Sequence, residues 1–231
     1  MKQIRIAHLY PNLLNIYGDK GNIITLTKRC EWRNIEIVID NINIGDNISE
    51  HDIYFMGGGQ DVQQIEVAKE IQKHKDFLTR ERDRGAVFLG ICGGYQLMGH
   101  YYQPHKGDRL EGLSLLDAYT VAGNKRFIGN VTVDWNIETL VGFENHSGLT
   151  YLQGDTIPIG TVVTGNGNNG EDKTEGARYK NVFGTYLHGS FLPKNPIFAD
   201  YLLELALGEK LPTLNDSIEQ KAHDSLVNMK Y

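Results

Sequence analysis

The residue with the clearest chemical potential is Cys92, which lies at the junction of two predicted elements. Ala86–Ile91 is a short, almost wholly apolar run, the pattern of a strand buried on both faces of a sheet. From Gly93 to about Tyr102 the apolar spacing predicts a helix. A cysteine at such a junction, followed by small residues such as Gly94 that permit a tight turn, is typical of a nucleophile elbow. The helix N-terminus would favour the thiolate over the thiol.

A second candidate is His188, which follows the strand-like run Val182–Thr185. A histidine at the end of a strand is well placed to act as a base, because nucleophile and base need to be neighbours only in space. A lone cysteine beside a buried strand is more often an inert core residue, and this is the interpretation that we favour for Cys30. For Cys92, the glycines of the turn and the late histidine favour a nucleophile.

The motifs around both residues resemble those of class I (triad-type) glutamine amidotransferases, in the branch of the cobyric acid synthases. Gly-Ile-Cys-Gly-Gly-Tyr-Gln around Cys92 and Tyr-Leu-His-Gly around His188 carry this resemblance, and both are specific for the class. The chain resembles even more closely the small amidotransferase subunits of lipid II isoglutaminyl synthases. That narrower resemblance covers nearly the whole chain and rests on His8–Pro11, Leu14–Asn22, Gly57–Asp61 and Gly142–His146.

The resemblance implies hydrolysis of the side-chain amide of L-glutamine through a covalent thioester. Cys92 would attack the amide carbon, and His188 would protonate the departing ammonia and activate water. The backbone N–H of Gly93 and that of Gly58 or Gly59 are candidates for the oxyanion hole. Glycine suits these positions because the substrate must approach the main chain closely.

Two further residues are candidates for binding glutamine. Arg126, in the segment Asn124–Gly129, is expected to clamp the α-carboxylate with two hydrogen bonds. The alternative for Arg126 is a solvated surface side chain. Gln96 lies one helical turn after Cys92 and is expected to line the pocket, and its alternative is an amide on the helix surface.

One position departs from the pattern of the wider class. Many class I amidotransferases carry a glutamate two residues after the histidine, where this chain has Ser190. The cobyric acid branch shares this gap, and a Cys–His pair can act without an acid, although the imidazole tautomer is then less firmly set. A third residue could come from elsewhere, including a partner chain. His100 and His105 do not form a metal site, and His146 is interpreted as fixing the fold or an interface.

The ammonia has no acceptor within this chain, which carries no Walker A motif. The resemblance implies a Mur-ligase-like synthetase subunit as partner in a heterodimer, with ATP and Mg²⁺ bound there and no cofactor in this chain. That partner would amidate the D-glutamate of the lipid II stem peptide to D-isoglutamine, a step of peptidoglycan synthesis. The alternatives are an amidotransferase subunit for another acceptor, such as a corrinoid carboxylate, and a catalytically silent scaffold.

The elements that position these residues alternate between strands and helices. Strands are predicted at Ile4–Tyr10, Ile35–Ile39, Asp52–Met56 and Ala86–Ile91, and helices at about 21–32, with Asp19 as cap, and 62–82. This order predicts an α/β fold of the class I amidotransferase (flavodoxin-like) type, with a parallel sheet covered by helices on both faces. Ligands bind such sheets beyond the carboxyl ends of the strands, where Cys92 and Gly57–Gly59 fall.

The second half of the chain is predicted to be largely antiparallel. Strand-like runs occur at Leu113–Val121, Phe127–Trp135, Val141–Phe143 and Pro158–Thr164. The segment 164–173 is interpreted as an exposed loop or hairpin tip that binds no phosphate. An amphipathic helix is predicted at Asn195–Leu207, and residues 211–231 are either a last helix or a tail that docks on a partner.

Composition limits the other possibilities. A chain of 231 residues without a Pro- or Ser-rich linker is interpreted as a single domain, residues 1–231. A net charge of −6 without a basic run argues against nucleic-acid binding. Two cysteines suit a reducing cytoplasm, and we expect neither a signal peptide nor a membrane span. Work at the membrane would require the partner or the lipid-linked substrate.

Overall fold

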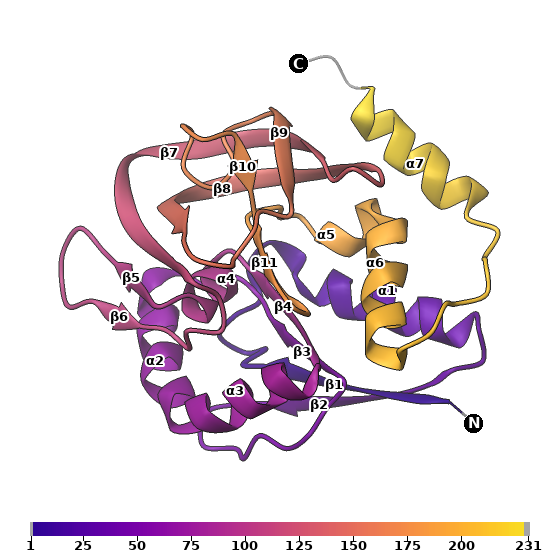
Figure 1. Ribbon diagram of the computed structural model, residues 1–231, viewed down its shortest axis with the longest axis horizontal. Coiled ribbons are helices and arrows are strands. Elements are labelled where there is room, and N and C mark those ends of the chain that lie inside the picture. Colours follow the sequence, from indigo (N-terminus) through magenta and orange to yellow (C-terminus); the bar gives the residue numbers. More distant parts are fainter. Residues whose placement is uncertain (1, 229–231) are drawn as a thin grey trace.

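The computed structural model describes residues 2–228 and contains two sheets (Figure 1). The first has the strand order β11-β12-β4-β3-β1-β2. Its strands are β1 (Gln3–Leu9), β2 (Glu36–Ile42), β3 (Ile53–Met56), β4 (Val87–Ile91), β11 (Ala177–Tyr179) and β12 (Val182–Thr185). All neighbours pair in parallel except β11 and β12. The parallel sheet predicted for the first half of the chain is therefore confirmed.

Helices cover both faces of this sheet, as predicted. Helices α1 (Lys20–Glu31) and α6 (Pro196–Leu207) lie on one face, and α2 (Asp61–Ile71) and α3 (Lys75–Arg84) on the other (Figure 1). The strands are apolar on both sides because both sides are buried. In β3, for example, Ile53 and Phe55 belong to the core around α1 and α6, whereas Tyr54 and Met56 belong to the core around α2 and α3.

Two predicted helices are shorter than expected. The run 62–82 is broken by a 3₁₀ turn, η2 (Gln72–His74), where the Gln72 side chain donates to the carbonyls of Glu111 and Gly112. The helix after Cys92 ends at Met98 as α4 (Gly93–Met98), and the chain then enters strand β5 (Tyr101–Gln103). Gly99 lies so close to the next sheet that a Cβ there would be 2.7 Å from the Ala118 carbonyl oxygen.

The second sheet is mostly antiparallel, as expected. Its order is β10-β9-β7-β5-β6, with β8 also paired to β7. Besides β5, its strands are β6 (Leu110–Glu111), β7 (Ala118–Asp134), β8 (Thr139–Leu152), β9 (Gly160–Thr164) and β10 (Thr174–Glu175). Two predicted strands, Leu113–Val121 and Phe127–Trp135, are in fact one long strand, β7, because an irregularity between Ala122 and Phe127 interrupts the apolar pattern without ending the pairing.

The segment 164–173 joins the antiparallel strands β9 and β10 as a hairpin tip that is exposed at both ends, as the sequence predicts, but its centre is buried. Asn168 and Asn169 are both buried. The Asn168 side chain accepts a hydrogen bond from Tyr95 Oη and donates to the carbonyl of Gly176, while the Glu144 carboxylate accepts from the Gly167 N–H. These polar side chains are buried because the loop has no regular secondary structure and its backbone needs partners.

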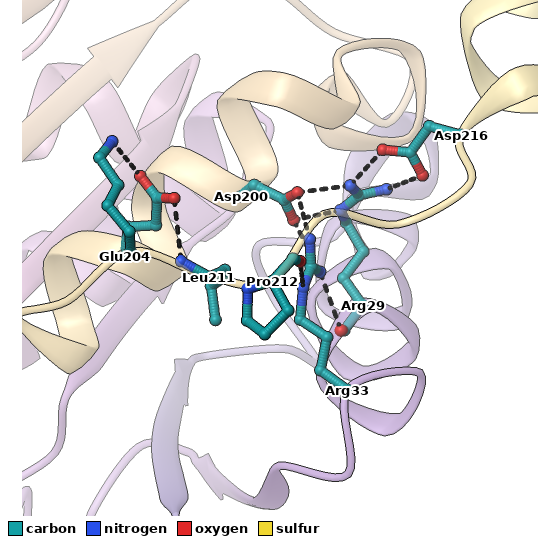
Figure 2. A network of polar contacts seen from close by, with 8 residues as sticks. Arg29, Arg33, Asp200, Glu204, Leu211, Pro212 and Asp216 are labelled. Atoms are coloured by element: carbon teal, nitrogen blue, oxygen red, sulfur yellow. Dashed lines mark hydrogen bonds and ion pairs between the residues drawn. The ribbon is translucent and has the colours of Figure 1, made fainter.

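The segment left open at 211–231 contains a helix, α7 (Ser217–Val227), that packs against α5 (Phe191–Lys194). Figure 2 shows how the chain before α7 is held. Arg29 of α1 is buried between the carboxylates of Asp200 and Asp216, and Arg33 also binds Asp200. Residues 229–231 lie outside the described part of the chain. Within residues 2–228, no helix has the length and apolar character needed to cross a membrane.

Candidate active site

Three segments with predicted roles meet because their strands end at one edge of the first sheet. The register pairs Met56 of β3 with Gly90 of β4, and Ile91 of β4 with Thr185 of β12. The loops that follow these strands therefore begin side by side. They carry the glycines 57–59, Cys92 and His188, at the edge where ligands of parallel sheets bind.

Cys92 adopts the strained conformation that a nucleophile elbow requires. Its φ of 51° and ψ of −104° lie in a region that residues other than glycine rarely occupy. The turn is as crowded as the glycine pattern predicts, because a Cβ on Gly94 would lie 2.3 Å from the Met56 carbonyl oxygen and one on Gly90 would lie 2.8 Å from the Tyr95 nitrogen. The observed geometry thus confirms the tight strand-to-helix turn.

The side chains of His188 and Cys92 both lie next to Gly58. The backbone of His188 is fixed by hydrogen bonds with Phe143 of β8, at 2.8 and 3.4 Å. The Cβ that Gly58 lacks would lie 3.4 Å from His188 Cε1 and 3.5 Å from Cys92 Cβ. The imidazole and the thiol side chain are therefore neighbours across Gly58, and a larger residue at 58 would press against both.

The His188 ring is neutral over the physiological range. Burial lowers its pKa from 6.5 to about 3, and the nearby His146, Arg126 and Lys194 act in the same direction. A neutral imidazole can accept a proton, but these surroundings do not stabilise the imidazolium that would result. Ser190 does not supply the missing acid, because its hydroxyl donates to the Gly18 carbonyl at 2.6 Å.

The structure separates the three glycines predicted for an oxyanion hole. Gly59 N lies only 3.1 Å from where a Cβ of Gly93 would be, so these two residues adjoin. The N–H of Gly58, in contrast, donates to Asp19 Oδ2 at 2.7 Å. Of the two alternatives predicted, Gly58 thus has its N–H engaged by Asp19, which favours Gly59. Gly59 and Gly93 therefore stay the candidate donors for the oxyanion hole.

A cavity of about 380 Å³ opens at this point. Its walls include Cys92, His188, Gly59, Gln96 and Arg126, all of which the sequence predicts to belong to one site. The volume lies in the range of small-molecule pockets. Since the wall combines a thiol, an imidazole, a cation and amide groups, it suits a small polar substrate such as an amino acid.

Arg126 lies at the cavity and is oriented by Asn145, a residue of the Gly142–His146 motif to which the sequence gave no role. The Arg126 Nε–H donates to Asn145 Oδ1 at 2.6 Å, and Nη2 lies 3.5 Å from the Asn145 carbonyl oxygen. The guanidinium thus retains donors for a ligand, as a carboxylate clamp needs.

Gln96 is buried rather than on the helix surface, which excludes the alternative left open for it. Its Oε1 accepts from Gln64 Nε2 at 2.7 Å, and its Nε2 donates to Tyr186 Oη at 3.2 Å. Tyr186 Oη also contacts Thr150 Oγ1 at 2.7 Å. This chain of hydrogen bonds fixes the wall of the cavity behind Cys92.

The three residues Glu144–His146 each have a different structural role. Glu144 binds the backbone of the 164–173 segment, and Asn145 orients Arg126. The His146 ring stacks on Tyr186 with ring centroids 3.6 Å apart, and its Nδ1 bonds to the Gly148 carbonyl. Burial lowers the pKa of His146 to about 4. The interpretation of His146 as a residue that fixes the fold agrees with these contacts.

Sequence reasoning assigned no role at the site to Gln64, Asn145 and Asp19, although the last two lie in the motifs that carry the narrower resemblance. Gln64 and Asn145 line the cavity. Gln64 is in a helix that follows the Gly57–Gly59 loop. This position was the only feature of the sequence that could have indicated that Gln64 lies near the site. Asp19 was read as a helix cap, but its side chain makes no capping hydrogen bond and instead binds Gly58.

Comparison with known proteins identifies the family of this chain. Residues 5–196 match the CobB/CobQ-like glutamine amidotransferase domain. The fold resembles the PurLQS structure from Thermotoga maritima (TM-score 0.58, 19% identity, 99% of both chains). It also resembles a crystal structure of a glutamine amidotransferase (TM-score 0.61, 14% identity, 87% of this chain and 98% of that one). The chain therefore belongs to the CobB/CobQ-like family of glutamine amidotransferases.

Two curated relatives narrow the comparison within that family. Both are named lipid II isoglutaminyl synthase (glutamine-hydrolyzing) subunit GatD. The Streptococcus pneumoniae protein is 41% identical, with 99% of this chain and 92% of the relative aligned. The Staphylococcus aureus protein is 45% identical, over 91% of this chain and 87% of the relative. A cobyric acid synthase from Caldanaerobacter subterraneus is 28% identical over 84% of this chain and 42% of its own length.

Proposed function

We propose that this chain is the glutaminase subunit of a lipid II isoglutaminyl synthase. The observation that carries the proposal is the meeting of Cys92, in its strained turn, with His188 across Gly58 in one cavity. The acceptor is inferred from the two relatives whose names state that they are such subunits. A corrinoid acceptor is less favoured, because the cobyric acid synthase aligns at lower identity and over under half of its length.

In the first half of the reaction, neutral His188 accepts the thiol proton of Cys92, and Sγ attacks the side-chain amide carbon of L-glutamine. The carbonyl oxygen becomes an oxyanion, which the N–H groups of Gly59 and Gly93 stabilise. His188 delivers a proton to the amide nitrogen as the C–N bond breaks. Ammonia leaves, and a γ-glutamyl thioester remains on Cys92.

In the second half, water replaces the thiolate. His188 removes a proton from the water as its oxygen attacks the thioester carbon. The C–S bond then breaks, the leaving sulfur takes this proton back from His188, and L-glutamate is released, which restores the Cys92 thiol and the neutral imidazole. Arg126, held by Asn145, binds the α-carboxylate in both halves, and Gln96 contributes to the wall around the side chain of the substrate.

The ammonia requires an acceptor on a second protein. We assign this role to a MurT-like, Mur-ligase-type partner that binds ATP and Mg²⁺ and amidates the D-glutamate of lipid II. This chain itself would use no cofactor. Because the proposed acceptor is lipid-linked and the proposed partner needs ATP, we propose that the complex works in the cytoplasm, at the inner face of the membrane.

We expect the partner to activate the glutaminase. Burial, together with the nearby His146, Arg126 and Lys194, lowers the pKa of His188 well below neutrality, and the position two residues after it is Ser190 rather than an acid. An acidic group of the partner that approaches this ring would favour the protonated state in the transition state. Binding should therefore raise kcat/KM for glutamine at least about tenfold, which corresponds to about 1.4 kcal/mol.

The test is ammonia release from L-glutamine by the chain alone and by the complex that co-purifies with it. Amidation of lipid II by the complex with ATP would establish the acceptor, and Cys92→Ala should abolish both reactions when glutamine is the nitrogen source. With free ammonia as the source, the Cys92→Ala complex should still amidate lipid II. Normal glutaminase activity of a folded Cys92→Ala protein would disprove the site, and amidation of a corrinoid instead of lipid II would disprove the acceptor.

A further inference from the structure

The turn that begins α1, residues 18–22, touches two of the loops of the site without lining the cavity. It belongs to the Leu14–Asn22 motif, to which the reaction steps above assign no role. Two of its side chains, Asp19 and Asn22, are fully buried. Buried polar side chains at a helix start normally satisfy the N–H groups of that helix, but neither of these does so. Both instead reach other segments.

Asp19 holds the loop that carries the proposed oxyanion hole. Its Oδ2 accepts the Gly58 N–H at 2.7 Å, and its Oδ1 has no hydrogen-bond partner among residues 2–228. Burial raises the pKa of this carboxyl to about 7. The packing is close, since a Cβ on Gly57 would lie 2.9 Å from Asp19 Oδ2. A carboxyl that is buried with one oxygen unsatisfied destabilises the fold, which suggests a role in the site.

The same turn also holds the segment that follows His188. Asn22 Oδ1 accepts the Leu192 N–H at 2.8 Å, and the Gly18 carbonyl accepts from Ser190 Oγ at 2.6 Å. Gly21 must be a glycine here, because a Cβ would lie 2.2 Å from Ser190 Oγ. Ser190 itself has a φ of 51°, so its backbone needs these contacts to stay in place.

We infer that the 18–22 turn positions the catalytic groups. Asp19 fixes the orientation of the Gly58 peptide, and Asn22 fixes the segment that follows His188. This inference rests on the proposed glutaminase function. Fixing Gly58 also fixes the next peptide, whose N–H belongs to Gly59, one of the two oxyanion donors. Asp19 and Asn22 are thus positioning residues, which act on the reaction through the loops and do not touch the substrate.

Loss of either contact should lower kcat and leave KM nearly unchanged. A displaced oxyanion donor or base weakens binding of the transition state, whereas the ground state is held by Arg126 and the cavity wall. Displacements of about 1 Å can lower rates about a hundredfold. For Asp19→Ala we expect a fall in kcat of at least about tenfold. Asp19→Asn retains an oxygen that can accept the Gly58 N–H, so it should recover most of the rate.

Hydrogen–deuterium exchange tests the contacts independently of glutaminase activity. In the full-length chain, Asp19→Ala should speed exchange in the peptide that contains Gly58 and Gly59, and Asn22→Ala should do so at Leu192. Asp19→Ser, which keeps a polar residue at the helix start, serves if Asp19→Ala does not fold. The matched control is Asp52→Ala, since Asp52 also binds a backbone N–H, that of Arg5, but at the opposite end of the sheet.

The two readouts separate the possible failures. Faster local exchange with a lower kcat in the co-purified complex, and recovery in Asp19→Asn, is the expected result. Unchanged exchange, or faster exchange with wild-type kcat, would overturn the inference while leaving the glutaminase function intact. A fall in kcat equal to that of Asp52→Ala would show a general effect on the fold and would also overturn it. A wild-type complex that releases no ammonia from glutamine would overturn the proposed function, and the inferred role with it.

Discussion

Cys92 and Cys30 differ in surroundings more than in sequence context. Cys30 is fully buried on α1, and burial raises the pKa of its thiol to about 12. Cys92 is partly exposed and lines the cavity. Only the residue at 92 combines access to solvent with a place at the candidate site.

We therefore predict that diazo-oxo-norleucine, an electrophilic analogue of glutamine, labels Cys92 and spares Cys30. The thiolate is the reactive species, and a thiol with a raised pKa inside the core forms it rarely. Peptide mass spectrometry after labelling of the folded chain gives the site directly. Cys92→Ala is the control and should remain unlabelled. Label found mainly on Cys30 would contradict the assignment of the nucleophile.

Arg126→Ala should raise KM for glutamine about tenfold or more, with a smaller change in kcat. The guanidinium would bind the α-carboxylate equally in the ground and transition states, so its loss should appear in KM. Lys125→Ala is the matched control, because Lys125 is the neighbouring cation but does not line the cavity. Steady-state kinetics of both variants, in complex with the partner, would decide. Equal KM values for wild type and Arg126→Ala would show that Arg126 does not bind the α-carboxylate of glutamine.

Glu175 gives a prediction about pH. Burial raises the pKa of its carboxyl from 4.5 to about 7. Between these values the folded state keeps a proton that the unfolded state has lost, so this residue contributes less stability as the pH rises from about 4.5 to 7. Glu175→Gln removes this effect. Relative to wild type, the variant should therefore gain stability with rising pH, by up to about 3 kcal/mol across this window.

Urea unfolding at pH 5 and pH 8 measures that difference. Glu36→Gln is the control, since Glu36 is exposed at the start of β2. A difference between Glu175→Gln and wild type that is the same at both pH values would show that the carboxyl of Glu175 titrates normally.

At the scale of elements, α1 is the helix through which the C-terminal segment is attached (Figure 2). Burial opposes the charge of Arg29, but the hydrogen bonds that its guanidinium donates to Asp200 and Asp216 hold its pKa above the usual range. Asp200 belongs to α6 and Asp216 precedes α7. One side chain of α1 thus joins two helices that follow it by more than 160 residues.

Arg29→Met should destabilise the fold by about 3 kcal/mol, because it leaves carboxylates without their partner. Methionine keeps much of the length of the side chain, so loss of charge is the main change. Lys28→Met is the matched control: Lys28 pairs with Glu31 on the exposed side of the same helix, and such pairs contribute about 0–1 kcal/mol. Urea midpoints of the two variants provide the comparison. Equal midpoints would mean that the buried pairs contribute little net stability.

The sequence predicted best those elements whose signal is local. The apolar run before Cys92 and the glycines after it define a strand and a turn by themselves, and both are present. Asp19 failed as a cap because a tertiary acceptor role, at Gly58, outweighs a local preference. Asn168 and Asn169 failed for a similar reason, since polar composition predicts exposure but these side chains satisfy buried backbone groups.

The residues of the candidate site also divide into those with a local sequence signal and those whose role depends on tertiary contacts. Cys92 and His188 were identified because their motifs are short and specific. Asn145 and Gln64 could not be assigned, because their importance lies in which side chain they orient, Arg126 or Gln96, and that depends on strand and helix packing. The sequence could not choose between Gly58 and Gly59 for the oxyanion hole, because it does not show in which direction a backbone N–H points; the bond from Gly58 to Asp19 favours Gly59.

At the scale of the whole molecule, the order of strands differs from their order along the chain. The second sheet, which extends from β5 to β10, is inserted between β4 and β12, although β4 and β12 are neighbours in the first sheet. During synthesis, Cys92 is therefore added before the second sheet, whereas His188 is added only after β12, which pairs with β4.

This order has a consequence during synthesis on the ribosome. A nascent chain that has reached β10 already holds its thiol, its glycine loop and its arginine, yet β4 still has an unpaired edge and the site has no base. Pairing of β12 closes that edge and delivers His188 in a single event. An incomplete translation product would therefore expose the unpaired edge of β4, which favours aggregation and binding by chaperones. Without His188, it could not hydrolyse glutamine.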